Sequence, residues 1–127
     1  METSEDYIKR KIAKFESERG KPAVRVKDIG RKGWHLWERE AWTFMVQHNL
    51  PHKVFVIERF QKYGEEGEIA YEGAKIGDRE YRIGYCIRGQ IGNKNGKWTW
   101  GQYCPFIPVD DLLPLLEKAK KEATLLF

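Results

Sequence analysis

Alternating side chains from Arg79 to Arg88 constrain the fold more than any other feature of this chain. The residues at positions 81, 83, 85 and 87 are Tyr, Ile, Tyr and Ile, and polar or small residues stand between them. A repeat of period two predicts a β-strand with one face toward a core. Asn95-Gly96, which follows, is a strong signal for a hairpin turn. We therefore expect Arg79–Arg88 to pair with a second strand over Lys97–Tyr103.

Shorter patterns extend this hairpin into a larger sheet. Three further segments are typical of strands and are separated by glycine-rich or basic turns: Ala23–Lys27, Lys53–Gln61 and Glu68–Glu72. Helices are predicted over Ser4–Arg19 and from Asp110 or Asp111 to about Thr124, because capping residues precede apolar stripes of helical period. The sequence therefore predicts an α+β fold, an antiparallel meander sheet of roughly four or five strands with N- and C-terminal helices packed on one face. No linker or repeat divides residues 1–127, which favours a single domain.

The segment Trp34–Asn49 fits two different structures. Trp37, Ala41, Met45 and His48 form a stripe of helical period, whereas Trp42, Phe44 and Val46 alternate as in a strand. We favour a helix, because Asn49-Leu50-Pro51 then supplies its end. Residues 37–48 remain open between the two.

The register of the predicted hairpin decides where the two cysteines lie. A two-residue turn at Asn95-Gly96 pairs residue 94 with residue 97, so that Ile87 faces Cys104 and Cys86 points to the other side of the sheet. A three-residue turn would place Cys86 opposite Cys104 instead. The sequence leaves both registers open.

The composition combines positive charge with aromatic side chains. The chain of 127 residues carries a formal net charge of +4 and contains five Trp, six Tyr and six Phe. So many aromatic residues argue against a disordered chain, and no apolar stretch approaches the ~20 residues that a membrane span needs. A charged N-terminus without an apolar segment, together with few cysteines, predicts a cytoplasmic protein. The abundance of Glu, Lys and Arg is typical of thermophile proteins.

Basic and aromatic side chains gather in the second half of the predicted sheet and in one loop. If Trp98 and Trp100 share an exposed face with Arg82 and Arg88, the sheet presents an aromatic and cationic surface. Unpaired bases stack on such rings while basic side chains contact phosphates. We therefore predict a nucleic-acid-binding protein that holds single-stranded or locally opened DNA or RNA. The predicted binding residues are Arg31, Lys32, Trp34, Arg82, Arg88, Lys94, Lys97, Trp98 and Trp100.

A competing hypothesis follows if the tryptophans point away from solvent. They then line a pocket, and the protein is a protein-interaction or small-ligand-binding module without catalytic activity. The arginines and lysines would in that case form a solvated surface. The sequence does not decide which face of the sheet the tryptophans occupy.

Signals for catalysis, metals and cofactors are weak. No nucleophile motif, dinucleotide-binding motif or phosphate-binding loop motif occurs in the chain. Cys86 and Cys104 lie too far apart to form a zinc knuckle with His48 and His52. The sequence therefore argues against an enzyme, a bound metal ion and a cofactor.

The predicted C-terminal helix is rich in leucine and continues into Leu125-Leu126-Phe127. An apolar chain end needs cover, either from the sheet or from a neighbouring molecule. We therefore predict that it packs back on the sheet or takes part in a homodimer through the C-terminal helix.

Overall fold

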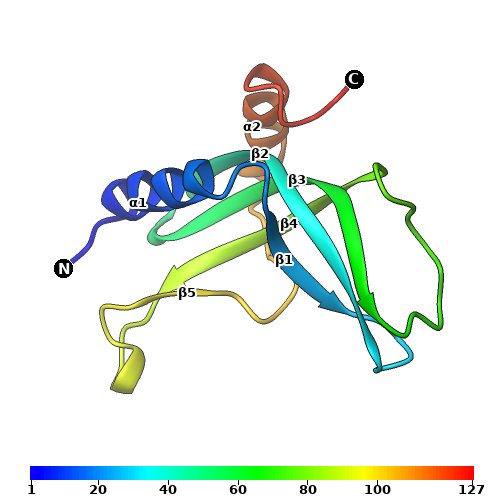
Figure 1. Ribbon diagram of the computed structural model, residues 1–127. Helices are drawn as coiled ribbons and strands as arrows, with labels where there is room; N and C mark the ends of the chain where they lie inside the picture. The colour runs from blue at the N-terminus through cyan, green and yellow to red at the C-terminus, as the bar shows by residue number, and fades with distance from the viewer.

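The computed structural model describes every residue from Met1 to Phe127 and contains two helices and one five-stranded sheet (Figure 1). The helices are α1 (Ser4–Ser17) and α2 (Val109–Lys121). The strands are β1 (Pro22–Lys27), β2 (Gly33–Gln47), β3 (Leu50–Gly67), β4 (Arg79–Arg88) and β5 (Trp98–Trp100), and a 3₁₀ turn, η1 (Gly92–Lys94), precedes β5. All neighbouring strands are antiparallel, in the order β1-β2-β3-β4-β5. The predicted α+β class and antiparallel meander are confirmed.

The first helix begins and ends where local chemistry predicts. The Thr3 hydroxyl accepts a hydrogen bond from the backbone N–H of Asp6 at 3.1 Å and caps the first turn. Gly20 follows the helix with a φ of 77°, which glycine adopts without strain. The buried face differs in detail from the predicted stripe, because it consists of Tyr7 and Phe15, whereas Ile12 is 37% exposed.

The helix expected over Trp34–Asn49 is wrong, because this segment forms strand β2. It pairs with β3 over its whole length, from Gly33 opposite Gly67 to Gln47 opposite Leu50. The register shifts between Leu36 and Trp37 and again between Arg39 and Ala41. The first shift leaves an extra residue, Tyr63, in β3, and the second leaves Glu40 extra in β2. Because a bulge displaces the alternation of side chains by one residue, Trp37 and Met45 of the helix-like stripe lie on opposite faces of the sheet.

The strand expected over Glu68–Glu72 does not form. β3 continues as far as Gly67, whose φ of 72° turns the chain, and residues 68–78 then make a long loop. β4 begins at the residue predicted for it, Arg79. The sheet therefore has five strands because β2 is a strand that forms a long hairpin with β3, and not because a short strand follows β3.

The hairpin between β4 and β5 is confirmed in outline but not in register. Cys86 lies opposite Trp100 and Arg88 opposite Trp98, which is neither of the registers expected for a tight turn at Asn95-Gly96. The connection spans residues 89–97 and contains η1. Two backbone hydrogen bonds close this connection. The Gly89 N–H donates to the carbonyl of Lys97, and the Gly96 N–H donates to the carbonyl of Gly89.

The two helices pack on opposite faces of the sheet, so the prediction that one face carries both is corrected. The core beneath α1 contains Val54 and Val56 of β3, whereas the core beneath α2 contains Phe55 and Ile57. Adjacent strand residues point to opposite faces. The continuous apolar run Val54–Ile57 therefore requires cover on both sides.

The sheet curls into a half-barrel, with α1 on its concave face (Figure 1). α1 covers only the end of this face that contains Val54 and Cys86. At the other end, β1 and β4 are not hydrogen-bonded to each other, and a cavity lies between them.

Candidate functional site

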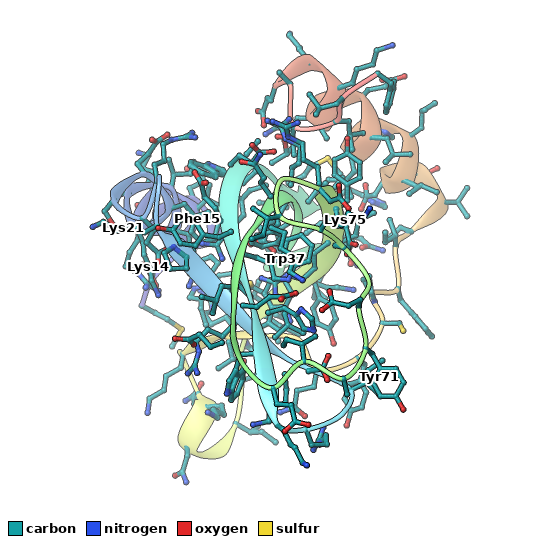
Figure 2. All side chains as sticks on the ribbon, turned by 45° about the vertical axis from the view of Figure 1, so that its right-hand side comes forward. Lys14, Phe15, Lys21, Trp37, Tyr71 and Lys75 are labelled. Carbon is teal, nitrogen blue, oxygen red and sulfur yellow. The ribbon has the colours of Figure 1, made fainter.

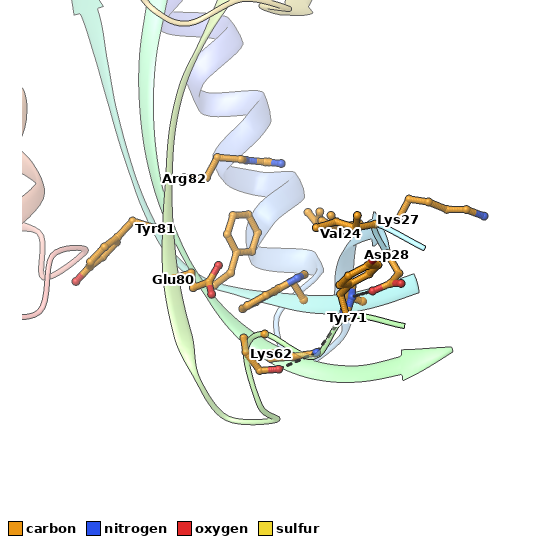
Figure 3. Close-up of a pocket in the computed structure, with 15 residues that line it drawn as sticks. Val24, Lys27, Asp28, Lys62, Tyr71, Glu80, Tyr81 and Arg82 are labelled. Carbon is orange, nitrogen blue, oxygen red and sulfur yellow. Dashed lines mark hydrogen bonds and ion pairs between the residues drawn. The ribbon is translucent and has the colours of Figure 1, made fainter. Parts of the chain in front are cut away.

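The open end of the concave face holds a cavity of about 440 Å³. Residues from β1, β2, β3, β4 and the 68–78 loop surround it (Figure 3). Figure 2 shows Trp37 near the middle of the molecule, with the loop that carries Tyr71 and Lys75 passing in front of the sheet. The apolar lining residues include Val24, Val26, Trp37, Phe60, Tyr71 and Ala74. This combination of aromatic and aliphatic walls is typical of a site for a small organic molecule.

A chain of buried polar side chains fastens the loop wall of the cavity to the sheet. The Asp28 carboxylate accepts hydrogen bonds from the backbone N–H groups of Gly30 at 2.9 Å and Ala70 at 3.1 Å. The Lys62 ammonium donates to the backbone carbonyl of Ala74 at 2.9 Å. His35 lies between the two anchors, 2.8 Å from each. The 68–78 loop is therefore held at two points by charged groups inside the protein.

The partners of His35 determine its hydrogen positions. A lysine ammonium can only donate, so Nδ1 of His35 accepts from Lys62 and Nε2 carries the hydrogen that it donates to Asp28. Lys62 uses its third donor on Glu65 at 2.7 Å. Both nitrogens of His35 are occupied in this arrangement, so neither is available to accept a proton from a molecule in the cavity. The network therefore supports a positioning role for His35 and not that of a general base.

Asp28 is ionised within this network although it is buried, at 1% exposure. Burial by itself raises the pKa of a carboxyl group. Hydrogen bonds from His35 and from the backbone of Ala70, Gly30 and Tyr71 outweigh burial and lower the pKa of Asp28 to about 2. Asp28 thus carries its negative charge throughout the physiological pH range, and this charge fixes the orientation of His35.

Arg82 forms the end of the cavity nearest to α1. Its side chain extends from β4 toward β1 (Figure 3), and its Nε donates to the buried carboxylate of Glu58 at 2.9 Å. Arg39 donates to the same carboxylate at 2.7 Å. Glu58 therefore holds two guanidinium groups in place. Tyr81, the neighbour of Arg82, points to the other face of the sheet, where its hydroxyl accepts from the backbone of Leu126.

The structure brings four of the predicted nucleic-acid-binding residues to one face, and that face is largely covered. Trp98 stacks on Tyr7 of α1 with ring centroids 4.5 Å apart, and its indole nitrogen donates to the carbonyl of Glu2 at 3.1 Å. Arg88 donates to the same carbonyl at 2.9 Å. Trp100 is more open, at 43% exposure, and lies against Arg82 at 4.5 Å. The aromatic and cationic cluster predicted from the sequence therefore exists, but α1 occupies much of the surface that a base would need.

The other predicted residues lie in two separate loops. Arg31, Lys32 and Trp34 belong to the β1–β2 turn and the start of β2, and Lys94 and Lys97 belong to the β4–β5 connection. Figure 1 shows these connections at opposite sides of the sheet. Trp34 is flanked by two basic residues of the neighbouring strand β1. The guanidinium carbon of Arg25 and the ammonium of Lys27 lie 4.2 Å and 4.3 Å from the centroid of its ring. The predicted residues thus form a covered cluster and two exposed basic loops.

The cysteines and histidines occupy unrelated environments. Cys86 is buried beneath α1, and burial raises the pKa of its thiol. Cys104 is exposed in the segment after β5. His48 bonds to Asp111 at 2.9 Å and thereby joins the end of β2 to the start of α2. No group of three or more His, Cys, Asp or Glu side chains is arranged to hold a metal ion.

The apolar C-terminus packs partly back onto the protein. Thr124 is buried and its hydroxyl hydrogen-bonds that of Thr43 at 2.8 Å. Leu125 packs with the core beneath α2, whereas Phe127 is 83% exposed. The outer side of α2 also exposes Leu113, at 62%. A homodimer through this helix stays a prediction.

Sequence reasoning identified Arg82 but missed the other residues that form the cavity. Phe60 lies inside the predicted strand Lys53–Gln61, and Lys62 continues the alternation of β3 one residue beyond its predicted end. Trp37 was assigned to a helical stripe, which hid its place beside Phe60. The signal that could have found these residues is the continued period-two pattern from Val54 to Lys62.

Neither helix is long and apolar enough to span a membrane. Comparisons of the chain with protein-family models, with curated proteins and with solved structures found no match.

Proposed function

We propose that the protein binds a small planar aromatic molecule in the cavity between β1 and β4. The observation that carries this proposal is the cavity itself, about 440 Å³ in volume and walled by aromatic and aliphatic side chains together with five charged ones, Lys27, Asp28, Lys62, Glu80 and Arg82. Small-molecule sites have volumes of roughly 300–1,000 Å³ and the same mixture of groups. This is the ligand-binding alternative that the sequence leaves open.

Each part of the cavity has a role in such binding. Trp37 and Phe60 come from adjacent strands and supply apolar and aromatic surface to a ring. Arg82 uses Nε and Nη2 on Glu58, so its Nη1 is free to donate to an oxygen of the ligand. The anchors at Ala70 and Ala74 hold the loop wall before a ligand arrives, and such pre-organisation lowers the entropic cost of binding.

A titration with 2-naphthol, followed by ¹H–¹⁵N NMR, tests this proposal. We expect saturable shifts at Trp37, Phe60 and Arg82. Trp37→Ala should weaken binding by at least about tenfold, because it removes an aromatic side chain from the wall. Trp34→Ala is the matched control, since Trp34 lies on the same strand and does not line the cavity. No saturable shifts at the cavity, or equal losses in the two variants, would contradict the proposal.

Binding of a single nucleic-acid strand, the leading hypothesis from the sequence, is a second candidate. The observation that favours it is that Lys94 and Lys97 are exposed and form no ion pair with a carboxylate of the chain. Contacts to phosphates release counterions, so affinity should fall steeply between about 50 and 200 mM salt. Lys94→Gln combined with Lys97→Gln should reduce that salt dependence, and Lys120→Gln combined with Lys121→Gln should not. A labelled strand that fails to bind at low salt would exclude this candidate.

A further inference from the structure

A second cavity, of about 280 Å³, lies between α1 and the concave face of the sheet. Four cationic side chains from three elements line it: Lys11 and Lys14 of α1, Arg39 of β2 and Arg82 of β4. Figure 2 shows Phe15 reaching from α1 toward the sheet, with Lys14 beside it. Positively charged side chains therefore line this cavity on the side of the helix and on the side of two strands.

The carboxylates in the cavity do not balance these charges. Only Glu18 and Glu58 line it, and both are bound by Arg39, at 3.2 Å and 2.7 Å. Lys11 and Lys14 form no ion pair. Four cations and two carboxylates leave an excess of two positive charges in a partly enclosed space.

Each arginine retains a nitrogen for a ligand. Arg39 uses Nε and Nη1 on its carboxylates, and Arg82 uses Nε and Nη2. Arg39 Nη2 and Arg82 Nη1 make no hydrogen bond, and neither is among the buried side-chain atoms that lack a partner. Both nitrogens are therefore open to solvent or to a ligand, on side chains whose orientation Glu58 already fixes.

The crowding of positive charge also affects Lys11. Burial lowers the pKa of its ammonium, and the charges of Lys14, Arg10 and Arg39 lower it further. A bound anion would offset this repulsion and would make charge-assisted hydrogen bonds to the same groups. The cavity is thus poised for an anion of small size.

The second cavity adjoins the aromatic one. Arg82 lines both. On β2, Trp37 of the first cavity and Arg39 of the second are two residues apart, and on β3 the same is true of Phe60 and Glu58. Two residues span about 6.6 Å along a strand, a distance that a linker no larger than a sugar can bridge.

We propose that the two cavities together bind one molecule, a phosphate monoester of a planar aromatic group, of the size of a mononucleotide. The inference rests on the proposed function, because the ring occupies the cavity between β1 and β4. The phosphate lies beneath α1, where Arg39 Nη2 and Arg82 Nη1 donate to its oxygens and Lys11 and Lys14 neutralise its charge. The class of ligand is therefore an aromatic ring joined to a phosphate through a short linker.

Calorimetric titrations with 2-naphthyl phosphate, 2-naphthol and inorganic phosphate, in phosphate-free buffer, test this inference. We expect 2-naphthyl phosphate to bind at least about tenfold more tightly than 2-naphthol, since charge-assisted hydrogen bonds distinguish the two. Lys11→Gln combined with Lys14→Gln should remove this advantage and leave 2-naphthol binding unchanged. Lys9→Gln combined with Lys21→Gln, which changes the net charge equally at exposed positions outside the cavity, should preserve it.

The outcomes separate the two proposals. Equal affinities for 2-naphthol and 2-naphthyl phosphate, or equal losses in the two double variants, would overturn the phosphate site and leave the aromatic cavity standing. Absence of 2-naphthol binding would overturn the proposed function itself. Tight binding of a thymidine oligonucleotide with no binding of 2-naphthyl phosphate would overturn the small-molecule assignment in favour of a nucleic-acid strand.

Discussion

Replacing Lys62 by Met tests whether the buried polar network stabilises the cavity wall. The Lys62 side chain is 1% exposed, and its ammonium donates to His35, Glu65 and the carbonyl of Ala74. Met preserves most of the length and the apolar stem of the side chain but has no donor. Nδ1 of His35 and the carbonyl of Ala74 would therefore lose their partner inside the protein.

The expected cost follows from the burial of these groups. Removal of one partner from a buried charged pair costs about 3–5 kcal/mol. The Glu65 side chain is 31% exposed and regains water, so we expect a loss near the lower limit, ~3 kcal/mol. With an unfolding entropy of about 2.1 cal/mol/K per residue, a chain of 127 residues would then lose about 11 °C in Tm.

Urea and thermal unfolding, followed by far-UV circular dichroism, measure this loss. Lys32→Met is the matched control, because that side chain is 70% exposed and its nearest carboxylate, Glu68, is 3.8 Å away; we expect a change of less than about 0.5 kcal/mol. Amide exchange at Ala70 should accelerate in the Lys62 variant as the loop loosens. A loss below about 1 kcal/mol together with unchanged exchange would refute this account of the network.

Three further substitutions probe the core, the electrostatics and the sheet. Leu115→Ala, at a fully buried position, should lower the free energy of unfolding by about 2–5 kcal/mol in urea, whereas Leu113→Ala should change it by less than about 0.5 kcal/mol. Because the pKa of Asp28 is lowered from 3.8 to about 2, its stabilising contribution is complete above pH ~4 and is lost as the pH falls through ~2. The stability difference between the protein and Asp28→Asn should therefore be constant above pH ~4 and shrink below it, and a difference that widens in acid would contradict the assignment. Gly84→Ala would place a methyl group 2.4 Å from the ring of Trp100, so the indole NMR signal of Trp100 should shift; an unchanged signal would argue against this contact.

Local patterns predicted the parts of the fold that depend on neighbours in sequence. The alternation of β4 and the N-terminal cap of α1, for which the sequence offers Thr3 or Ser4, involve groups a few residues apart, so the sequence carries them directly. The strand β2 is different, because a bulge at Glu40 interrupts its alternation and only the ladder with β3 reveals the strand. Its assignment required the tertiary pairing.

The candidate site also combines features that local sequence patterns predict with features that only tertiary contacts determine. The sequence identified Trp98, Trp100, Arg82 and Arg88 as a cluster, and they do share one face of the sheet. It did not determine that α1 would cover that face, since the contact of Tyr7 with Trp98 joins residues at opposite ends of the chain.

By itself, then, the sequence determined an α+β chain with an antiparallel meander and two terminal helices, because periodicity and caps are local properties. Only the tertiary structure decided that the helices lie on opposite faces and that Trp37, Phe60 and Arg82 surround one cavity. The physical reason is that the curl of the sheet and the bulges in β2 and β3 set which distant side chains are in contact. These contacts between distant residues, and not the net charge of the chain, shape the cavity.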